Sequence, residues 1–311
     1  MADISRSEVA TLIEEAYADT LLAAAKEGST ALSAFPTVNM GTKTTHLPVL
    51  ATLPEAGWVT ESATDPAGVK PQSKVTWADR TLVAEEIAVI IPVHENIIDD
   101  ATVAVLSEIA ELGGQAIGKK LDQAVFFGTQ KPASWVSPAL LPAAIAAGQV
   151  VNVVDGIANE SDIVGATNQV AEAIAVAGWA PDTLISSLAL RYKVANLRDA
   201  NGNPVFRDES FAGFRTFFNK NGAWDPEAAV ELIADSSRIR IGVRQDIQVK
   251  FLDQATLGTG ENQINLAERD MVALRLKARY AYVLGNSATA IGANKTPVGA
   301  VAPAVAQGGG S

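Results

Sequence analysis

The chain has 311 residues, of which 48% are apolar, and its formal net charge is −11, with 35 acidic and 24 basic residues. This length and apolar content suffice for one large domain or two interleaved ones. The acidic balance argues against tight nucleic-acid binding by the whole chain, because that binding needs clustered Lys and Arg, although a local basic face stays open. The absence of cysteine excludes disulfides, thiolate nucleophiles and thiolate metal sites. We expect no secretory signal and no membrane span, and therefore folding in a cytoplasm.

The first predicted element is an amphipathic helix over residues 4–26. Ser5 and Glu8 have the spacing of a capping box. Its apolar residues follow a helical stripe, made of Val9, Leu12, Ile13, Ala16, Tyr17 and Leu21. A lone helix of this length is marginal in water, so it needs a partner surface, either its own core or another copy.

A two-legged extended arm follows. Residues 29–55 read as irregular and turn-rich, residues 57–61 as a short strand, and residues 62–74 as a polar tip. Residues 75–93 alternate as an extended segment, and Pro92 marks an edge or a strand exit. A leg of roughly 12 residues reaches about 40 Å, whereas a compact chain of this size has a radius of gyration near ~19 Å. An isolated hairpin is barely stable, so an arm that projects predicts a partner.

The longest helical pattern runs over residues 99–127, with Asp99 and Asp100 suited to its positive start. Gly113 and Gly114 lie in its middle, where each costs about 1 kcal/mol relative to Ala, so we expect a bend or a close crossing there. The Pro- and Ala-rich residues 132–150 are a candidate crossover between domains.

A second α/β region follows the crossover. Helices are predicted over residues 161–177 and 188–198, with a turn at 199–204. Short strands are predicted over residues 182–186, 230–234, 238–243 and 247–252.

The clearest strand spans residues 271–284. Its apolar residues face one way, namely Val272, Leu274, Leu276, Ala278, Tyr280 and Tyr282. Arg275, Lys277 and Arg279 face the other way as a basic row, read either as a solvated face, as an intersubunit face or as a contact with packaged DNA.

The order of these pieces resembles tailed-phage major capsid proteins of the Hong Kong 97 type, over roughly residues 30–288. Six segments carry the resemblance: WVTE with VTW at 58–61 and 75–77, PVHENIIDD at 92–100, DQAVFFGT at 122–129, residues 191–204 ending LRDANGNP, ADSS with IGVR at 234–244, and RYAYVL at 279–284. The resemblance implies an α+β Hong Kong 97-like fold with seven parts. These are an N-terminal arm (1–34), a first peripheral part (35–55), an extended loop (56–92), a peripheral domain with the spine helix (93–150), an axial domain (151–258), a closing peripheral strand (259–290) and a mobile C-terminal tail (291–311).

The resemblance further implies a shell subunit that assembles as pentamers and hexamers into an icosahedral capsid around double-stranded DNA. It implies a separate scaffolding protein, a portal protein and, as a possibility, a decoration protein, with assembly in the host cytoplasm and final residence in the virion. It implies no enzyme activity, cofactor or metal. Some relatives form a Lys–Asn cross-link, but Lys70, Lys74 and Asn286 cannot be aligned to that chemistry. The alternative is an encapsulin-type shell protein; a soluble α+β enzyme and a decoration or tail protein are more distant rivals.

The nearest match to a catalytic motif is the G-x-x-x-x-G-K spacing at residues 113–119. A phosphate loop precedes a helix, whereas this segment lies inside a helical pattern, and Lys120 replaces the magnesium-binding hydroxyl. His46 and His94 stand apart from each other and from any metal-ligand partner, so a metal site is not predicted. Ser-His-Asp chemistry stays open from sequence, although no Gly-x-Ser-x-Gly motif is present.

Two residue sets follow for assembly. The predicted intersubunit residues are Trp58, Glu61, Lys70, Lys74, Trp77, Arg80, Arg275, Lys277 and Arg279. The predicted hinge residues are Gly57, Pro92, Gly113 and Gly114.

Overall fold

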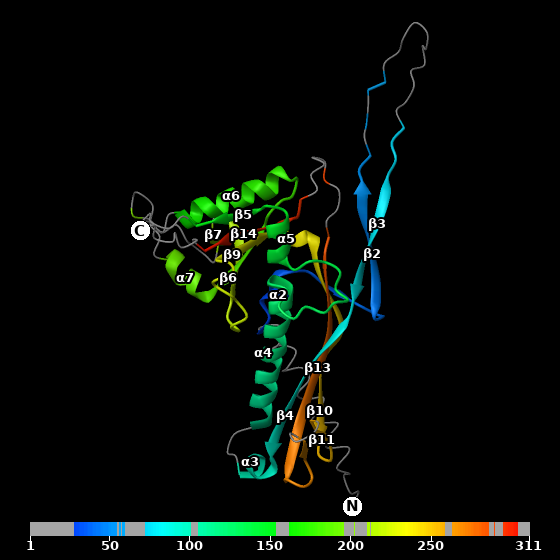
Figure 1. Cartoon of the computed structure of the whole chain (residues 1–311), viewed down its shortest axis with the longest axis vertical. Helices are drawn as coiled ribbons and strands as arrows, with labels where there is room; N and C mark the ends of the chain where they lie inside the picture. The colour runs from blue at the N-terminus through cyan, green and yellow to red at the C-terminus, as the bar shows by residue number, and fades with distance from the viewer. Residues whose placement is uncertain are drawn as a thin grey trace, which may run out of the picture.

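The computed structural model describes the following residues: 28–54, 56, 58–59, 72–100, 105–153, 162–195, 202, 210–211, 213–258, 263–285, 289 and 295–303. The predicted helix at 4–26 and most of the predicted arm tip lie outside these residues. Figure 1 shows a long sheet running down the molecule, a second sheet with helices beside its upper end, and a two-stranded arm that projects beyond both.

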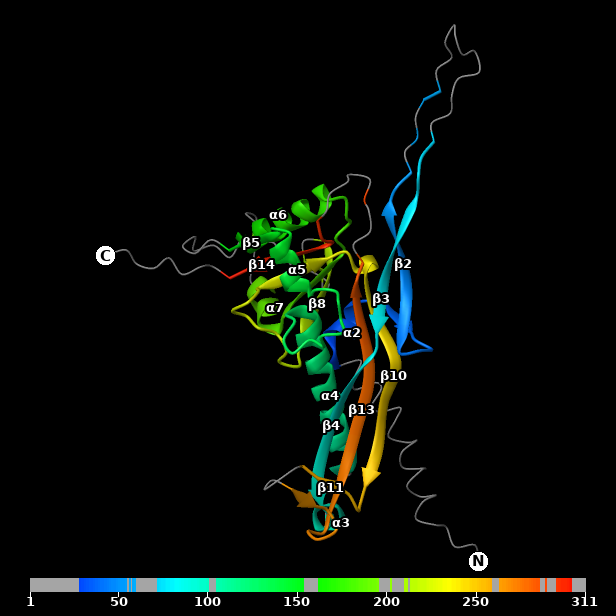
Figure 2. The same cartoon turned by 45° about the vertical axis from the view of Figure 1, so that its right-hand side comes forward.

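The long sheet has the strand order β1-β10-β13-β4, and we call it the peripheral sheet. Its strands are β1 (Thr37–Asn39), β10 (Ile239–Leu252), β13 (Met271–Leu284) and β4 (Glu85–His94). β13 lies in the middle, antiparallel to both β10 and β4. The helix α4 (Val105–Phe126) runs along one face of this sheet (Figures 1 and 2), and α3 (Glu95–Asp100) lies at its far end. The strand predicted over 271–284 is confirmed, and Pro92 lies in the edge strand, as predicted.

The middle of α4 packs closely on β13. A Cβ built on Gly113 would lie 3.0 Å from both Cδ atoms of Leu276, which is tighter than ordinary van der Waals contact. The predicted close crossing is therefore confirmed at Gly113. The predicted continuous helix over 99–127 is confirmed only from Val105, because residues 101–104 are outside the described part of the chain.

The arm is the antiparallel pair β2 (Thr44–Thr52) and β3 (Thr76–Val83). The prediction that residues 29–55 are irregular is wrong, because the short helix Thr30–Ala34, β1 and β2 lie in this range. The single proline of β2, Pro48, does not prevent pairing in a two-stranded ribbon. Each strand there has one open edge, so the missing N–H of Pro48 breaks no second ladder. The prediction of a strand over 57–61 is also wrong at residues 58 and 59, since the pairing ends at Thr52↔Thr76.

The second sheet has the order β5-β14-β9-β6-β8-β7, and we call it the axial sheet. Its strands are β5 (Val150–Asn152), β14 (Val298–Ala302), β9 (Glu231–Ala234), β6 (Thr183–Ser187), β8 (Phe214–Asn219) and β7 (Ser210–Phe211). The helices around it are α2 (Thr30–Ala34), α5 (Leu140–Ala146), α6 (Asp162–Val176) and α7 (Leu188–Ala195). The core of α5 and α4 contains Leu232 and Ala300, whereas the core of α6 and α7 contains Ile233 and Val301. Alternate residues of one strand thus enter two cores, and helices cover both faces.

Several predicted domain boundaries are wrong. The predicted first peripheral part at 35–55 contains the arm strand β2, and the predicted extended loop at 56–92 contains most of β4, which belongs to the peripheral sheet. The predicted mobile tail at 291–311 contains β14, which is inserted between β5 and β9 and is almost fully buried. The predicted axial domain at 151–258 contains β10, which belongs to the peripheral sheet. The two strands predicted at 238–243 and 247–252 form this one strand, with register shifts between Val243 and Gln248. The errors at β4, β10 and β14 concern strands whose partners are distant in sequence, and the apolar pattern of a strand does not specify its partner.

The minor elements are the single-turn helix at Ser236–Arg238 and the pair β11 (Thr256–Leu257) and β12 (Ile264–Asn265). None of the helices in the described segments has the length and apolar character to cross a bilayer.

Candidate assembly surfaces

The arm carries large apolar side chains without cover. Trp58 is 100% exposed and Trp77 is 67% exposed. Trp77 is paired in register with Leu50. Asp79, two residues after Trp77 on the same side of the ribbon, contacts His46. Lys74 is also exposed, whereas Glu61, Lys70 and the hinge candidate Gly57 lie outside the described residues.

The base of the arm is anchored in a small core of its own. Leu82 and Ala84 are completely buried and pack with Met40, Ala281 and Val283. The indole N–H of Trp135 donates a hydrogen bond of 3.0 Å to the carbonyl of Val83. The root of the arm is therefore fixed to the body, and beyond it β2 and β3 stay paired with each other as far as Thr52 and Thr76.

The basic row lies on the face of β13 that points away from α4. Arg275, Lys277 and Arg279 are half-buried, and alternate residues on their neighbours are mostly exposed. The row's register partners are Ile90, Ala88 and Glu86 on β4, and Lys250, Gln248 and Gln245 on β10. Lys277 Nζ lies 3.9 Å from Glu86 Oε2. The predicted orientation of the row is confirmed, and its intersubunit role remains a prediction.

A buried carboxylate joins the two sheets. Asp122 of α4 is completely buried and accepts hydrogen bonds from the start of α2: Ser29 Oγ at 2.7 Å, Thr30 N at 2.9 Å and Ala31 N at 3.0 Å. It also accepts from two amide groups at the end of β8, Asn219 Nδ2 at 3.1 Å and Asn221 Nδ2 at 2.8 Å. Burial raises the pKa of the Asp122 carboxyl, and the hydrogen bonds oppose that shift.

The same joint brings the chain at Gly28 against α4. A Cβ on Gly118 would lie 2.9 Å from the carbonyl carbon and oxygen of Gly28, so only glycine fits there. We call Asp122 and its donors the Asp122 joint. Sequence reasoning missed it, because a single Asp inside an amphipathic helix normally faces solvent.

A hollow of about 400 Å³ lies between the base of the arm and the adjoining ends of β10 and β13. Three arginines line it, Arg80 from β3, Arg238 from the single-turn helix and Arg240 from β10. Its apolar lining is formed by Leu47, Val49, Leu53 and Val283. We call it the arginine crease. Of its arginines, the sequence had singled out only Arg80.

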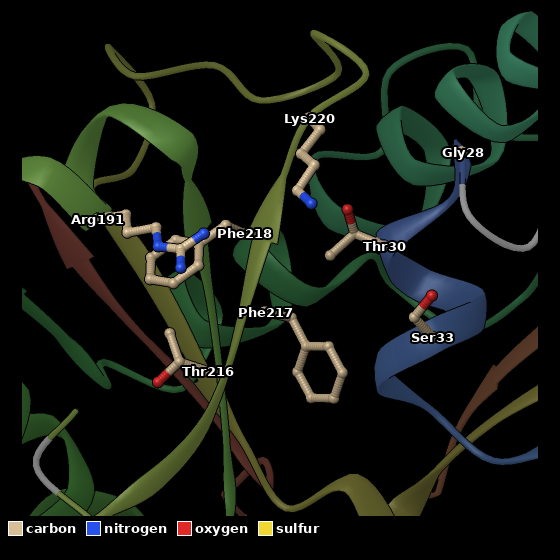
Figure 3. A pocket seen from close by; sticks show the side chains of 8 residues that line it. All are labelled: Gly28, Thr30, Ser33, Arg191, Thr216, Phe217, Phe218 and Lys220. Carbon is tan, nitrogen blue, oxygen red and sulfur yellow. The ribbon is translucent and has the colours of Figure 1, made fainter. Parts of the chain in front are cut away.

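A smaller hollow of about 210 Å³ lies between α2 and β8. Figure 3 shows Arg191 stacked over the ring of Phe218, with its guanidinium carbon 5.7 Å from the ring centre. Thr30, Phe217 and Lys220 line the rest of it.

The remaining sequence hypotheses concern hinges and chemistry. Pro92 is exposed in β4, and Gly113 and Gly114 are buried in α4, so their hinge role remains a prediction. The segment 113–119 lies inside α4, where its N–H groups serve the helix, as expected. In the described parts of the chain, no three His, Asp or Glu side chains gather as a metal site would require.

The comparisons with known proteins agree with this architecture. The model of the phage capsid family matches residues 10–292. This chain belongs to the phage capsid family. The match covers the peripheral sheet, the arm, α4 and the axial sheet except β14, which lies at Val298–Ala302.

Solved structures give the same result. A chain from Mycobacterium phage Cain is 78% identical, with coverage of 98% of this chain and 99% of that one and a TM-score of 0.81. A chain from Mycobacterium phage Adephagia is 77% identical, with the same coverage and TM-score. A chain from Microbacterium phage Oxtober96 is 40% identical, with coverage of 89% and 91% and a TM-score of 0.76. No curated protein matches the sequence.

The predicted identity is confirmed: the chain is a tailed-phage major capsid protein with the Hong Kong 97-like fold. Nothing in the comparisons favours the encapsulin alternative. As a member of a capsid family, the protein is a structural component of the virion.

Proposed function

We propose that this capsid protein builds an icosahedral shell of pentamers and hexamers around double-stranded DNA and performs no catalysis. The observation that carries the proposal is the projecting arm, whose Trp58 and Trp77 are uncovered in the single subunit. Exposed aromatic side chains on an isolated ribbon are stabilised when a second surface covers them. In a shell, a neighbouring copy supplies that surface.

Each contact in such a shell can be modest. Every subunit is held by several neighbours at once, and each contact already formed raises the effective concentration for the next one. We propose that the arm adds one such contact and that the basic row adds another by pairing with acids of a neighbour. Ion pairs of this kind fix orientation more than they add affinity.

The net charge of −11 suits a wall that encloses DNA without binding it tightly. We propose that the interior face repels most of the packaged phosphates, so that DNA is confined rather than held. Assembly in the host cytoplasm would then need a separate scaffolding protein and a portal protein, with a decoration protein as an optional addition.

We also propose that the axial and peripheral sheets make different contacts in the shell. The axial sheet with its helices would meet around the five- and sixfold axes, and the peripheral sheet with α4 would link neighbouring rings. Gly113, Gly114 and Pro92 would absorb the differences between pentamers and hexamers. Comparison of precursor and mature shells tests this hinge role, which fails if the backbone at these positions does not move.

Expression of the chain with its phage's assembly factors tests the main proposal. We expect electron microscopy to show closed particles of uniform size. A stable monomer or small oligomer on size-exclusion chromatography, with no closed particles, would overturn it.

A further inference from the structure

The two ends of the peripheral sheet differ in charge. The arginine crease lies where β10 begins and β13 ends. At the opposite end, exposed acids gather where β10 ends, β13 begins and α3 starts. We call this group the acidic pole; its members are Glu95, Asp253, Glu268 and Asp270. Both strands have 14 residues, so the crease and the pole are about 45 Å apart and cannot meet within one subunit.

The crease concentrates positive charge beside apolar surface. No carboxylate is among the residues that line it in the described part of the chain. Arg238 Nε lies 3.8 Å from Asp235, and Arg240 Nη1 donates to the carbonyl of Ile239 at 2.9 Å. The acid nearest in sequence on the arm, Asp79, adjoins Arg80 in β3 and therefore points to the opposite face of the ribbon, where it contacts His46. Three clustered arginines favour an anionic occupant.

The acidic pole has the complementary composition. Arg269 is the one basic residue in the segment 266–270, beside Glu268 and Asp270. The backbone N–H of Glu95 donates to the carbonyl of Asp270 at 3.0 Å, which holds the start of α3 against the start of β13. Ile97 of α3 is 52% exposed, so the pole presents an apolar side chain together with its carboxylates.

We propose that the acidic pole of one copy docks into the arginine crease of a neighbouring copy. Carboxylates of the pole pair with Arg80, Arg238 and Arg240, and Ile97 covers part of the apolar wall formed by Leu47, Val49 and Leu53. A phosphate backbone would satisfy the arginines but would leave that wall against water, which favours a protein occupant. Because the two surfaces differ, the contact is head-to-tail, and it continues from copy to copy instead of ending at a dimer. The inference rests on the proposed shell function and names one of its contacts.

Cross-linking tests this contact directly, since the natural chain has no cysteine. Ser237→Cys places a thiol in the crease and Ala267→Cys places one beside the pole, and both positions are exposed. After assembly, a short bismaleimide should convert the double variant into a ladder of trimers and longer chains on a denaturing gel. Each single variant should stay monomeric on the gel, because the surface that faces its thiol carries no cysteine. Mass spectrometry should find the two substituted positions joined.

Charge exchange provides a second test. Arg240→Glu and Glu268→Arg should each lower the yield of closed particles about tenfold, and their combination should restore most of it. The matched control combines Arg240→Glu with Glu172→Arg, an exposed acid on α6, and it should restore nothing. Unfolding of each unassembled variant checks that the subunit still folds.

The outcomes separate this contact from the shell function. If the natural chain closes into particles but the double cysteine variant gives no ladder, the contact is wrong and the shell function stands. Loss of DNA retention without loss of particles in Arg240→Glu would assign the crease to nucleic acid and would equally overturn the contact. If the natural chain forms no closed particles under any condition, the proposed function itself fails.

Discussion

The axial and peripheral sheets differ in how completely the helices of the subunit cover their strands. The axial strands β6, β9 and β14 are buried at nearly every residue, because helices cover both faces of their sheet. The peripheral strand β4 alternates between half-buried and exposed residues along its whole length, because α4 covers one face only. The comparison teaches that the core strands of the axial sheet are covered within one subunit, whereas the peripheral sheet has one uncovered face, which we propose that other copies cover.

The largest expected effect is at the Asp122 joint, which connects the two regions. Asp122→Asn would turn an amide N–H₂ toward groups that are themselves donors, such as Ser29, Asn219 and Asn221. We expect a loss of about 4 kcal/mol in the free energy of unfolding, measured by urea denaturation of the unassembled subunit.

The matched control for this change is Asp225→Asn. Asp225 is exposed and accepts a local hydrogen bond from the N–H of Glu227 at 3.0 Å, which the Asn carbonyl can also accept. A change below about 0.5 kcal/mol is expected there. Equal losses in the free energy of unfolding at the two positions would show that the Asp122 joint stabilises the subunit no more than an exposed local hydrogen bond does.

The next prediction compares substitutions on the two faces of β13. Leu276→Ala removes a completely buried side chain that packs on Gly113, and we expect a loss of about 3 kcal/mol in the free energy of unfolding. Lys277→Ala, at the next residue on the opposite face, should change it by less than about 0.5 kcal/mol while reducing particle yield. A large stability loss at Lys277 would mean that the outer face is already covered within the subunit.

A pH effect is expected from the axial core. Glu231 is completely buried beside Thr167, whose Oγ1 lies 2.5 Å from Glu231 Oε1, and burial raises the pKa of Glu231 to about 7. Because the folded state binds the proton more tightly, the associated stability is fully present below about pH 4.5 and is lost as the pH rises to 7 and beyond.

Glu231→Gln replaces the carboxyl by a group that stays neutral. At pH 8 the variant should be more stable than the natural chain by up to about 3 kcal/mol, and near pH 4 the two should be similar. Chemical denaturation across this range measures the difference, and the exposed Glu227→Gln is the control. An unchanged pH profile in Glu231→Gln would assign the dependence to another group.

The last prediction concerns the arm, where a substitution should affect assembly far more than the stability of the subunit. Trp77→Ala removes a side chain that is two-thirds exposed, so thermal unfolding of the unassembled protein should change little, by less than about 1 kcal/mol. The yield of closed particles should nevertheless fall severalfold, because the covering surface belongs to a neighbour. Normal assembly with this variant would show that the face of the arm that carries Trp77 does not contact a neighbouring copy.

The family and most elements follow from the sequence. The alternation over residues 271–284 predicts both the strand and the two faces of β13, because a strand covered on one side keeps a period of two. The helical period around Gly113 and Gly114 predicts α4 and its close crossing. The described intersubunit candidates lie where expected, on the arm and on the outer face of β13, and their intersubunit role remains a prediction.

Other features depend on distant pairing. The strand at Val298–Ala302 reads as part of a Pro- and Ala-rich tail, yet β5 and β9 on either side make it an interior strand of the axial sheet. The arginine crease assembles residues from positions 80, 238 and 240, and the Asp122 joint combines residues from positions 29, 122, 219 and 221.

The sequence by itself determined the family, the periodic elements and the face that each regular strand or helix presents, since periodicity is a local property of the chain. Only the tertiary structure decided which sheet β10 and β14 join, where Asp122 finds its donors, and how one end of the peripheral sheet becomes basic and the other acidic. These features depend on hydrogen bonds and packing between segments up to about two hundred residues apart, and no local pattern specifies such partners.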